Sequence, residues 1–293
     1  MPELPEVETV RERLAPVLTG HRFEGVEIHD PRLVRPYEPA EVAAELEGER
    51  VAAVERRGKY LIFRFESGRV LLIHLRMTGN LRHGRGLQDD PHRRAVVRLD
   101  DGSDVAYRDL RRFGTWLLME PGELEPYLAA KVGEEPLDVL FTAARLGGRL
   151  AGRRAPVKAA LLDQRTLAGM GNIYVDEALW RARIHPLRPA ESLDRNELRR
   201  LHRGIRAALE HGIARQGSTL RNYALPDGAA GSMQDEFRVY GRGGEPCDRC
   251  GTPIAKTRVA GRGTWFCPSC QPAAQAATSS PSRPSRSRRQ SSV

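Results

Sequence analysis

The chain has 293 residues, a formal net charge of +9 at pH 7 and a hydrophobic fraction of 40%. This length allows two ordinary domains with buried cores, and the composition excludes a fibrous or wholly disordered protein. It has no apolar run near the ~20 residues of a membrane span, and its acidic N-terminus lacks the basic flank of a signal peptide. We therefore expect a cytoplasmic protein with no membrane partner.

Positive charge is concentrated in the second part of the chain. Residues 1–120 contain 20 Lys/Arg and 21 Asp/Glu, a net −1, whereas residues 121–293 contain 27 and 17, a net +10. Such a basic half is typical of proteins that bind a polyanion, most often nucleic acid. A basic protein without such a partner remains the alternative.

The chain begins with two Pro-Glu pairs, Pro2-Glu3 and Pro5-Glu6. Once Met1 is removed, Pro2 has a free secondary amine, and an α-amino group has a pKa of ~7.7–8.0 against ~10.4 for lysine, so more of it is nucleophilic at pH 7. Attack on an aldehyde-like sugar carbon would give an iminium ion, which stays cationic and acts as an electron sink. The same residues are also typical of a helix start. Both interpretations are open from these residues alone.

The first 120 residues read as one helix followed by strands. Val7, Val10, Leu14 and Val17 recur at helical spacing after Pro5, which predicts an amphipathic helix. Runs rich in β-branched and aromatic residues predict strands, and the turn signal at 100–103 predicts a hairpin. The predicted strands are Phe23–Ile28, Arg50–Arg56, Tyr60–Phe65, Val70–Leu75, Ala95–Leu99 and Val105–Arg108. We expect residues 1–120 to form a sandwich of two antiparallel sheets.

Residues 121–235 have helical periodicity and predict a separate helical domain. The predicted helices are Leu124–Val132, Phe141–Leu150, Val157–Leu167, Val175–Ala182 and Arg195–Ile213. Residues 236–271 contain all four cysteines and predict a small attached module. Residues 272–293 are rich in Ala, Ser, Pro and Arg and contain no acidic residue, which predicts a disordered basic tail.

The four cysteines form two Cys-x2-Cys pairs, Cys247/Cys250 and Cys267/Cys270. This spacing brings four thiolates together around a tetrahedral zinc ion. Four cysteine ligands leave no open coordination position, so we expect one structural Zn²⁺. Between the pairs, Gly261–Thr264 predicts a hairpin tip that offers Arg262 to a phosphate or a base, with a solvated turn as the alternative.

Three separated segments resemble the bacterial formamidopyrimidine-DNA glycosylase family. They are Pro2–Thr9, Gly169–Tyr174, and the four-cysteine module with Arg262–Pro268, and the resemblance covers essentially residues 2–271. Leu4 and Ile173 favour the purine-directed branch over the related endonuclease VIII branch, which typically begins Pro-Glu-Gly-Pro-Glu.

The resemblance implies an α+β fold with an N-terminal β-sandwich, a helix-two-turns-helix domain and a zinc finger. It also implies a monomeric DNA glycosylase/AP lyase of base excision repair. Its partner would be double-stranded DNA containing oxidised purines, such as 8-oxoguanine and formamidopyrimidines, or abasic sites. Strand cutting would proceed by β,δ-elimination. Two alternatives are an enzyme for oxidised pyrimidines and a noncatalytic zinc-containing DNA-binding protein that kept the fold.

By this resemblance the chain start holds the chemistry. Pro2 would attack the sugar C1′ of the damaged nucleotide, Glu3 would be the acid/base partner that protonates the opening sugar ring, and Glu6 would help to hold the site. Lys59 would contact a phosphate near the lesion. A surface lysine on a strand edge is the alternative for Lys59.

Other residues would fill the gap left by an extruded base and bind the backbone. Met77 and Phe113 would be wedges, Arg111 would face the orphaned cytosine, and Arg112 lies in the same DNA-contacting segment. Without the resemblance, Met77 and Phe113 would be interpreted as core residues. Leu110 replaces the proline usual in this segment.

The helical half would bind phosphate. The turn Gly169–Asn172 brings Asn172 to a helix start, where free N–H groups attract anions, and Lys158 and Arg262 would contact the backbone. A simple N-cap is the alternative for Asn172. Residues 217–240 would hold the loop that covers the flipped base, although Gly231–Gln234 departs from the family's aromatic pattern.

Overall fold

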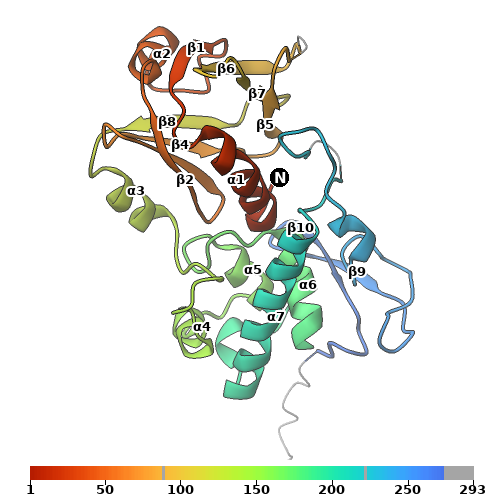
Figure 1. The fold of residues 1–293 in the computed structure, drawn as a ribbon. Coiled ribbons are helices and arrows are strands. Elements are labelled where there is room, and N and C mark those ends of the chain that lie inside the picture. The colour runs from red at the N-terminus through yellow and green to blue at the C-terminus, as the bar shows by residue number, and fades with distance from the viewer. Residues whose placement is uncertain (88–89, 221–222, 274–293) are drawn as a thin grey trace, which may run out of the picture.

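The computed structural model describes residues 1–87, 90–220 and 223–273. Its first part is a helix and two antiparallel four-stranded sheets, drawn from red to yellow in Figure 1. The expected β-sandwich is therefore confirmed. The expected disordered tail at 272–293 lies, from residue 274 onward, outside the described residues.

The two sheets alternate along the chain. In one, the order is β1 (Phe23–Ile28), β6 (Arg93–Leu99), β7 (Asp104–Asp109) and β5 (Gly79–Gly84); in the other it is β2 (Val51–Arg57), β3 (Tyr60–Phe65), β4 (Val70–His74) and β8 (Thr115–Met119). All six predicted strands are present. Helix α2 (Pro39–Leu46) and strands β5 and β8 were not predicted, because their apolar patterns are short.

Helix α1 (Leu4–Leu18) packs into the sandwich core. Val7, Val10 and Leu14 share that core with residues of both sheets, as the helical spacing predicts. Strand β3 is apolar on both faces because its inner face lies in this core and its outer face lies under α3 (Leu124–Lys131).

The helical part contains α4 (Ala143–Leu150), α5 (Val157–Leu162), α6 (Asn172–Ala182) and α7 (Arg195–Ala214), with short 3-10 turns at Ala190–Ser192 and Met233–Glu236. Helix α5 ends five residues before the predicted end. Asp163 explains this, since its carboxylate accepts bonds from the Arg165 N–H and the Thr166 hydroxyl and so stabilises a turn instead. Among the described residues, no helix is long and apolar enough to cross a membrane.

The cysteine module forms a hairpin of β9 (Ala255–Val259) and β10 (Arg262–Phe266), drawn in blue beside α6 in Figure 1. The predicted hairpin is confirmed, but its turn lies at residues 260–261, so Arg262 opens β10. Trp180 of α6 packs against Ile254, Cys247 and Cys267. This cluster docks the module onto the helical part.

The start of the chain joins the sandwich to the helical part. Leu4 belongs to the helical core rather than to the sandwich core, and its N–H donates to the Gly169 carbonyl at 3.0 Å. Gly169 has a φ of +82°, and a Cβ there would lie 2.6 Å from the Leu4 side chain. A glycine is therefore required for this close approach.

Candidate active site

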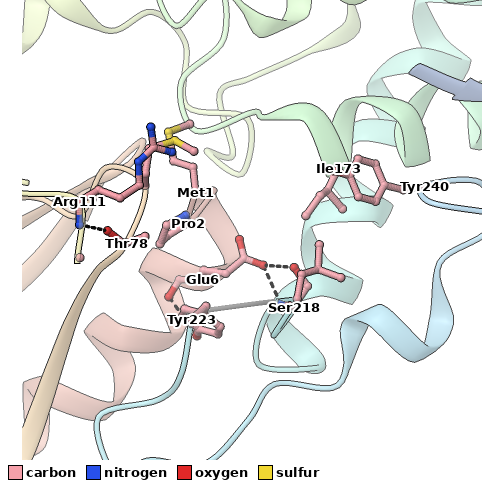
Figure 2. Close-up of a pocket in the computed structure, with 12 residues that line it drawn as sticks. Met1, Pro2, Glu6, Thr78, Arg111, Ile173, Ser218, Tyr223 and Tyr240 are labelled. Atoms are coloured by element: carbon pink, nitrogen blue, oxygen red, sulfur yellow. Dashed lines mark hydrogen bonds between the residues drawn. The ribbon is translucent and has the colours of Figure 1, made fainter. Parts of the chain in front are cut away.

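A cavity of about 510 Å³ lies where the chain start, the sandwich loops and the helical half meet. Figure 2 shows its lining residues, which come from segments far apart in the sequence. The lining comprises Met1, Pro2, Glu6, Met77, Thr78, Gly79, Arg111, Ile173, Ser218, Leu220, Tyr223 and Tyr240. Pro2 is itself buried, whereas Met1, which is attached to its nitrogen, lines the cavity and is 43% exposed.

Glu3 is buried beside Pro2 and binds the start of α6. Its carboxylate accepts the N–H of Ile173 at 3.0 Å and that of Tyr174 at 3.3 Å. Burial raises the pKa of Glu3, while Lys59 and the two N–H groups oppose that rise. A carboxyl group with a raised pKa is suited to act as a proton donor near neutral pH.

The contact between Glu3 and α6 explains why that helix begins before its predicted start. The first N–H groups of a helix lack partners within the helix, and here a carboxylate some 170 positions away in the sequence supplies two bonds. The helix therefore starts at Asn172 instead of Val175. The helical periodicity does not show this start, although the resemblance had placed Asn172 at the start of a helix.

Glu6 holds three segments together. Its carboxylate accepts the Glu3 N–H at 2.9 Å, the Tyr174 hydroxyl at 2.9 Å and the Ser218 N–H at 2.8 Å. The Ser218 hydroxyl adds a fourth bond at 3.1 Å, and Tyr223 donates to the Glu6 carbonyl at 3.3 Å. Tyr174, Ser218 and Tyr223 were not predicted as site residues, although Tyr174 lies in the Gly169–Tyr174 segment and the other two lie in the loop expected over the base.

Lys59 lies in the turn between β2 and β3 and is only 5% exposed, so its interpretation as a surface lysine was wrong. Burial lowers its pKa to about 8, an effect that Glu3 partly offsets. The turn is held by Glu135, which accepts the Gly58 N–H at 2.9 Å and the Arg57 guanidinium at 3.1 Å.

The N-terminal amine of the full chain belongs to Met1 and lies in the same environment. Its pKa is lowered, first by burial and also by the positive charges of Lys59 and Arg111, while Glu3 and Glu6 oppose the change. The Pro2 amine of a chain without Met1 would experience the same charges. A lowered pKa increases the nucleophilic fraction of an amine at neutral pH.

The predicted wedge residues are exposed and do not lie in the core, and Met77 also lines the cavity. Met77 is 39% exposed and Phe113 is 52% exposed, so their interpretation as core residues was wrong. The Arg111 guanidinium lies over the Phe113 ring at 4.7 Å. Arg112 is turned away from them and pairs with Asp30 at 2.6 Å.

Lys158 and Asn172 both face the cysteine module. The Lys158 ammonium and the Asn172 amide each donate to the Gly263 carbonyl at 3.0 Å, next to the exposed Arg262. Lys158 is fully buried and also pairs with Asp176 at 2.7 Å. The residue at the N-cap of α6 is Gly171, so the N-cap interpretation of Asn172 was wrong.

The loop expected over the base, residues 217–240, is described except for 221–222. Its two ends are tied together, since the Thr219 N–H donates to Gln234 at 2.8 Å and the Gly231 N–H donates to Thr219 at 3.0 Å. Ser218, Leu220, Tyr223 and Tyr240 line the cavity. The loop thus forms one wall of the site.

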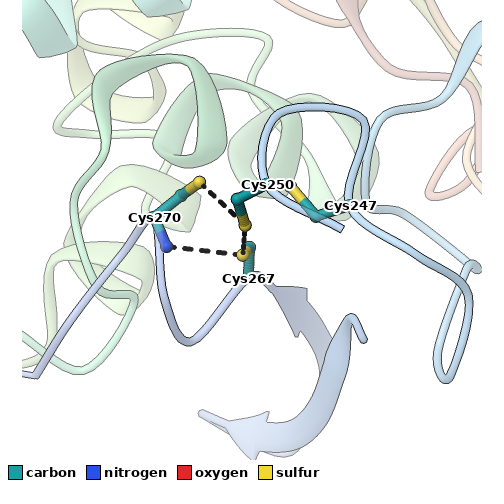
Figure 3. A group of neighbouring side chains, drawn as sticks. All are labelled: Cys247, Cys250, Cys267 and Cys270. Carbon is teal, nitrogen blue, oxygen red and sulfur yellow. Dashed lines mark hydrogen bonds between the residues drawn. The ribbon is translucent and has the colours of Figure 1, made fainter. Parts of the chain in front are cut away.

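The four cysteines converge as the sequence predicted (Figure 3). Their sulfur atoms all lie within 4.8 Å of one another, and the Sγ atoms of Cys250 and Cys267 are 3.5 Å apart. Zn–S bonds of ~2.3 Å place tetrahedral ligands roughly 3.8 Å apart, so the donor set fits one zinc ion. All four thiols are free of disulfides. The site is a closed, structural zinc site.

Removal of zinc is expected to undock the cysteine module. Structural zinc contributes ~10–16 kcal/mol to the folding of such modules, and the Trp180 indole donates to the Cys247 sulfur at 3.4 Å. A strong chelator should therefore change tryptophan fluorescence and increase hydrogen exchange at residues 255–266. Added zinc should reverse both effects. Cys270→Ser should resemble chelation, and Ser269→Ala, at an exposed neighbour that is not a ligand, should not.

Family models match three parts of the chain. Residues 1–116 match the formamidopyrimidine-DNA glycosylase N-terminal domain, residues 132–224 match the formamidopyrimidine-DNA glycosylase H2TH domain, and residues 244–273 match the zinc finger found in FPG and IleRS. These parts coincide with the sandwich, the helical half and the cysteine module.

Relatives and solved structures match nearly the whole chain. Formamidopyrimidine-DNA glycosylase of Symbiobacterium thermophilum is 49% identical over 295 residues, which cover 100% of this chain and 96% of the relative. A crystal structure of a Lactococcus lactis FPG mutant with a DNA that contains Fapy-dG matches with a TM-score of 0.87 and 40% identity, covering 93% and 100% of the two chains. The MutM (FPG) protein from Thermus thermophilus matches with a TM-score of 0.83 and 44% identity, covering 92% and 98%. The chain belongs to the formamidopyrimidine-DNA glycosylase family.

Proposed function

We propose that the protein is a bifunctional DNA glycosylase/AP lyase that removes oxidised purines from double-stranded DNA in base excision repair. The observation that carries this proposal is the placement of the buried Pro2 in the lining of a cavity of about 510 Å³, with the buried Glu3 next to it in the chain. A protein that only binds DNA has no need of an enclosed N-terminal amine. The Lactococcus lactis relative, solved with a Fapy-dG DNA, supports the same class of substrate.

The chemistry follows from the residues around the amine. The Pro2 nitrogen attacks C1′ of the damaged nucleotide, the glycosidic bond breaks and the base leaves with a proton. Glu3 gives a proton to the ring oxygen, so the sugar opens and C1′ becomes doubly bonded to the cationic nitrogen. General acid/base assistance of this type contributes ~10²–10⁴ in rate.

The iminium ion then directs strand cutting. Loss of a C2′ proton returns electrons toward the cationic nitrogen and expels the 3′ phosphate, and a second elimination expels the 5′ phosphate. The negative charge of Glu3 raises the pKa of Lys59 and so favours its charged form. Lys59 would contact a phosphate near the lesion. Hydrolysis of the remaining iminium frees the Pro2 amine.

The duplex would lie across the cavity mouth. Met77 and Phe113 would fill the gap beside the extruded base, Arg111 would face the opposite cytosine, and Arg112 would contact the same segment of DNA. Asn172 and Arg262 would bind backbone phosphates, and the fully buried Lys158, which pairs with Asp176, would hold the hairpin that carries Arg262 through its bond to the Gly263 carbonyl. The partner is double-stranded DNA with oxidised bases or abasic sites, and we propose that a monomer binds it.

Borohydride trapping tests this function directly. A reductant converts the iminium into a stable amine and leaves the protein covalently attached to DNA, so a duplex with 8-oxoguanine opposite cytosine should give an adduct. The same lesion opposite adenine should give less, because Arg111 would read the cytosine. An equal or stronger adduct with oxidised pyrimidines would instead support the pyrimidine-directed alternative, and the absence of any adduct would exclude the lyase.

Replacement of Lys59 is expected to move the pH dependence of cleavage. The amine must be unprotonated to attack, so activity falls as the pH drops through its pKa. The Lys59 charge lowers the pKa of the N-terminal amine, and its own pKa of about 8 keeps it charged over most of this range. Lys59→Met should therefore raise the amine pKa and shift the acidic limb of kcat/KM to higher pH.

The measurement is a pH–rate profile at a preformed abasic site, between about pH 5 and about pH 9. The readout is the pH at which the acidic limb of the profile lies, and not the maximal rate, because loss of a phosphate contact lowers the rate at every pH. Lys59→Arg keeps the charge and should leave the limb near its wild-type position. A limb that stays in place or moves to lower pH in Lys59→Met would contradict the assignment.

A further inference from the structure

The loops that hold Met77 and Phe113 lie side by side at the ends of neighbouring strands. Strand β5 pairs with β7, and the register places Gly79 opposite Asp109. Met77 and Thr78 therefore precede β5 at the same edge of the sheet where residues 110–114 follow β7. This register brings together two segments about 30 positions apart in the sequence.

Asp109 is the centre of the second loop. It is 1% exposed, and its carboxylate accepts the N–H groups of Arg111 at 3.2 Å, Phe113 at 2.9 Å and Gly114 at 2.8 Å. A buried carboxylate that accepts several backbone N–H groups fixes the path of the chain around it. The backbone of Arg111 and Phe113 is thus determined by one side chain.

Thr78 links that loop to the first one. Its hydroxyl donates to the Asp109 carboxylate and accepts the Arg111 N–H at 3.0 Å, a bond that is drawn in Figure 2. Thr78 is 6% exposed, so water does not replace these bonds easily. The residue next to Met77 therefore contacts both the centre and the backbone of the Arg111 loop.

An ion pair between Arg112 and Asp30 helps to set the relative positions of Arg111 and Phe113. Arg112, between them, has a left-handed φ of 59°, which is uncommon for a residue with a side chain. Asp30, 3% exposed, accepts two bonds from its guanidinium at 2.6 and 2.8 Å. With Arg112 held in this way, Arg111 stacks on Phe113 at 4.7 Å.

We propose that Thr78 and Asp109 are positioning residues that join Met77, Arg111 and Phe113 into one preformed wedge. Discrimination of the opposite base then depends on the Thr78–Asp109 pair, although neither side chain needs to touch a base. This inference rests on the proposed function. It adds that the two wedge loops act as one unit because the buried Thr78 hydroxyl bonds to both the Asp109 carboxylate and the Arg111 N–H.

The test uses Thr78→Val, which removes the hydroxyl and keeps the volume, with Thr78→Ser as the conservative rescue. Two substrates are compared: 8-oxoguanine in a duplex, opposite cytosine or adenine, and an abasic site in a single strand, which has no gap to fill. Thr78→Val should lower excision from the cytosine duplex roughly 10- to 100-fold, the effect of losing one buried hydrogen-bond partner. Cleavage of the single strand should fall much less, and the preference for cytosine over adenine should decrease.

A matched control is Thr166→Val. Thr166 is fully buried, and its hydroxyl donates to Asp163 at 3.3 Å in the helical half. If Thr166→Val lowers the stability of the protein, cleavage of both substrates should fall in parallel. Asp30→Asn is a second variant, since it releases Arg112 without changing Thr78. It should lower the same two ratios as Thr78→Val: excision from the cytosine duplex relative to cleavage of the single strand, and excision opposite cytosine relative to excision opposite adenine.

The outcomes separate the two proposals. Altered ratios in Thr78→Val and Asp30→Asn, normal ratios in Thr166→Val and recovery in Thr78→Ser support the preformed wedge. If the wild type cuts both substrates and the ratios of Thr78→Val and Asp30→Asn equal those of the wild type, only the inference is overturned. If the wild type cuts neither substrate, the proposed function fails and the inference fails with it.

Discussion

A chain that keeps any residue in front of Pro2 is expected to form far less borohydride-stable adduct with an 8-oxoguanine duplex than a chain that begins at Pro2. An amide nitrogen has no available lone pair and cannot attack C1′. The structure adds a second reason, because Met1 lines the cavity with Pro2 and so occupies space where the sugar would bind. Loss of the nucleophile should lower cleavage by ~10³-fold or more.

Three variants make this expectation specific. A tag at the C-terminus should leave adduct formation intact, which excludes a general effect of tagging. Pro2→Gly replaces the secondary amine with a primary amine. It should give a smaller amount of adduct, since its imine can lose the N–H proton and become neutral. Mass spectrometry of each protein establishes whether Met1 is present. Full strand cleavage by a chain shown to retain Met1 would exclude Pro2 as the nucleophile.

Sequence patterns predicted those elements whose own residues carry a clear local pattern. Strands β1 and β3 were predicted at their observed bounds, because each is a compact run of β-forming residues between turn residues. Helix α7 was predicted within one residue of its end, and its start is stabilised by Asp194, which accepts the N–H groups of Asn196 and Glu197. Strands β5 and β8 were missed, since their apolar patterns are short.

The same distinction applies to the site. Pro2, Glu3 and the cysteines could be identified because they stand in short motifs with a chemical reason for their spacing. Ser218 and Tyr174 could not, since each matters only through Glu6, which is far away in the sequence. The buried state of Lys59 was also hidden, because it depends on packing between the two halves of the molecule.

Gly171→Ala is expected to cost roughly 10²–10⁴ in the rate of base excision, the contribution of a general acid. Gly171 has an extended φ of −136°, which alanine can adopt, so backbone conformation is not the reason for a glycine there. A methyl group at this position would overlap the carboxyl group of Glu3. Since Glu3 also holds the start of α6, the methyl group must displace the Glu3 carboxyl group or the helix.

The control is Gly148→Ala in α4, where a Cβ would meet nothing within 4 Å. Alanine is the better helix former there, so this variant should be at least as stable as the wild type and equally active. Single-turnover excision of 8-oxoguanine measures the effect on both proteins. Equal rates for Gly171→Ala and Gly148→Ala would show that the space beside Glu3 is not limiting.

A double-mutant cycle identifies the cause of the loss. Glu3→Ala removes both the acid and the group that the Gly171 methyl would overlap, so Gly171→Ala should have almost no further effect in that background. If the substitution instead acts through α6 and the phosphate-binding turn, it should lower DNA affinity by the same factor whether or not Glu3 is present. The first result assigns Gly171 to the positioning of the acid, and the second assigns it to the binding of DNA.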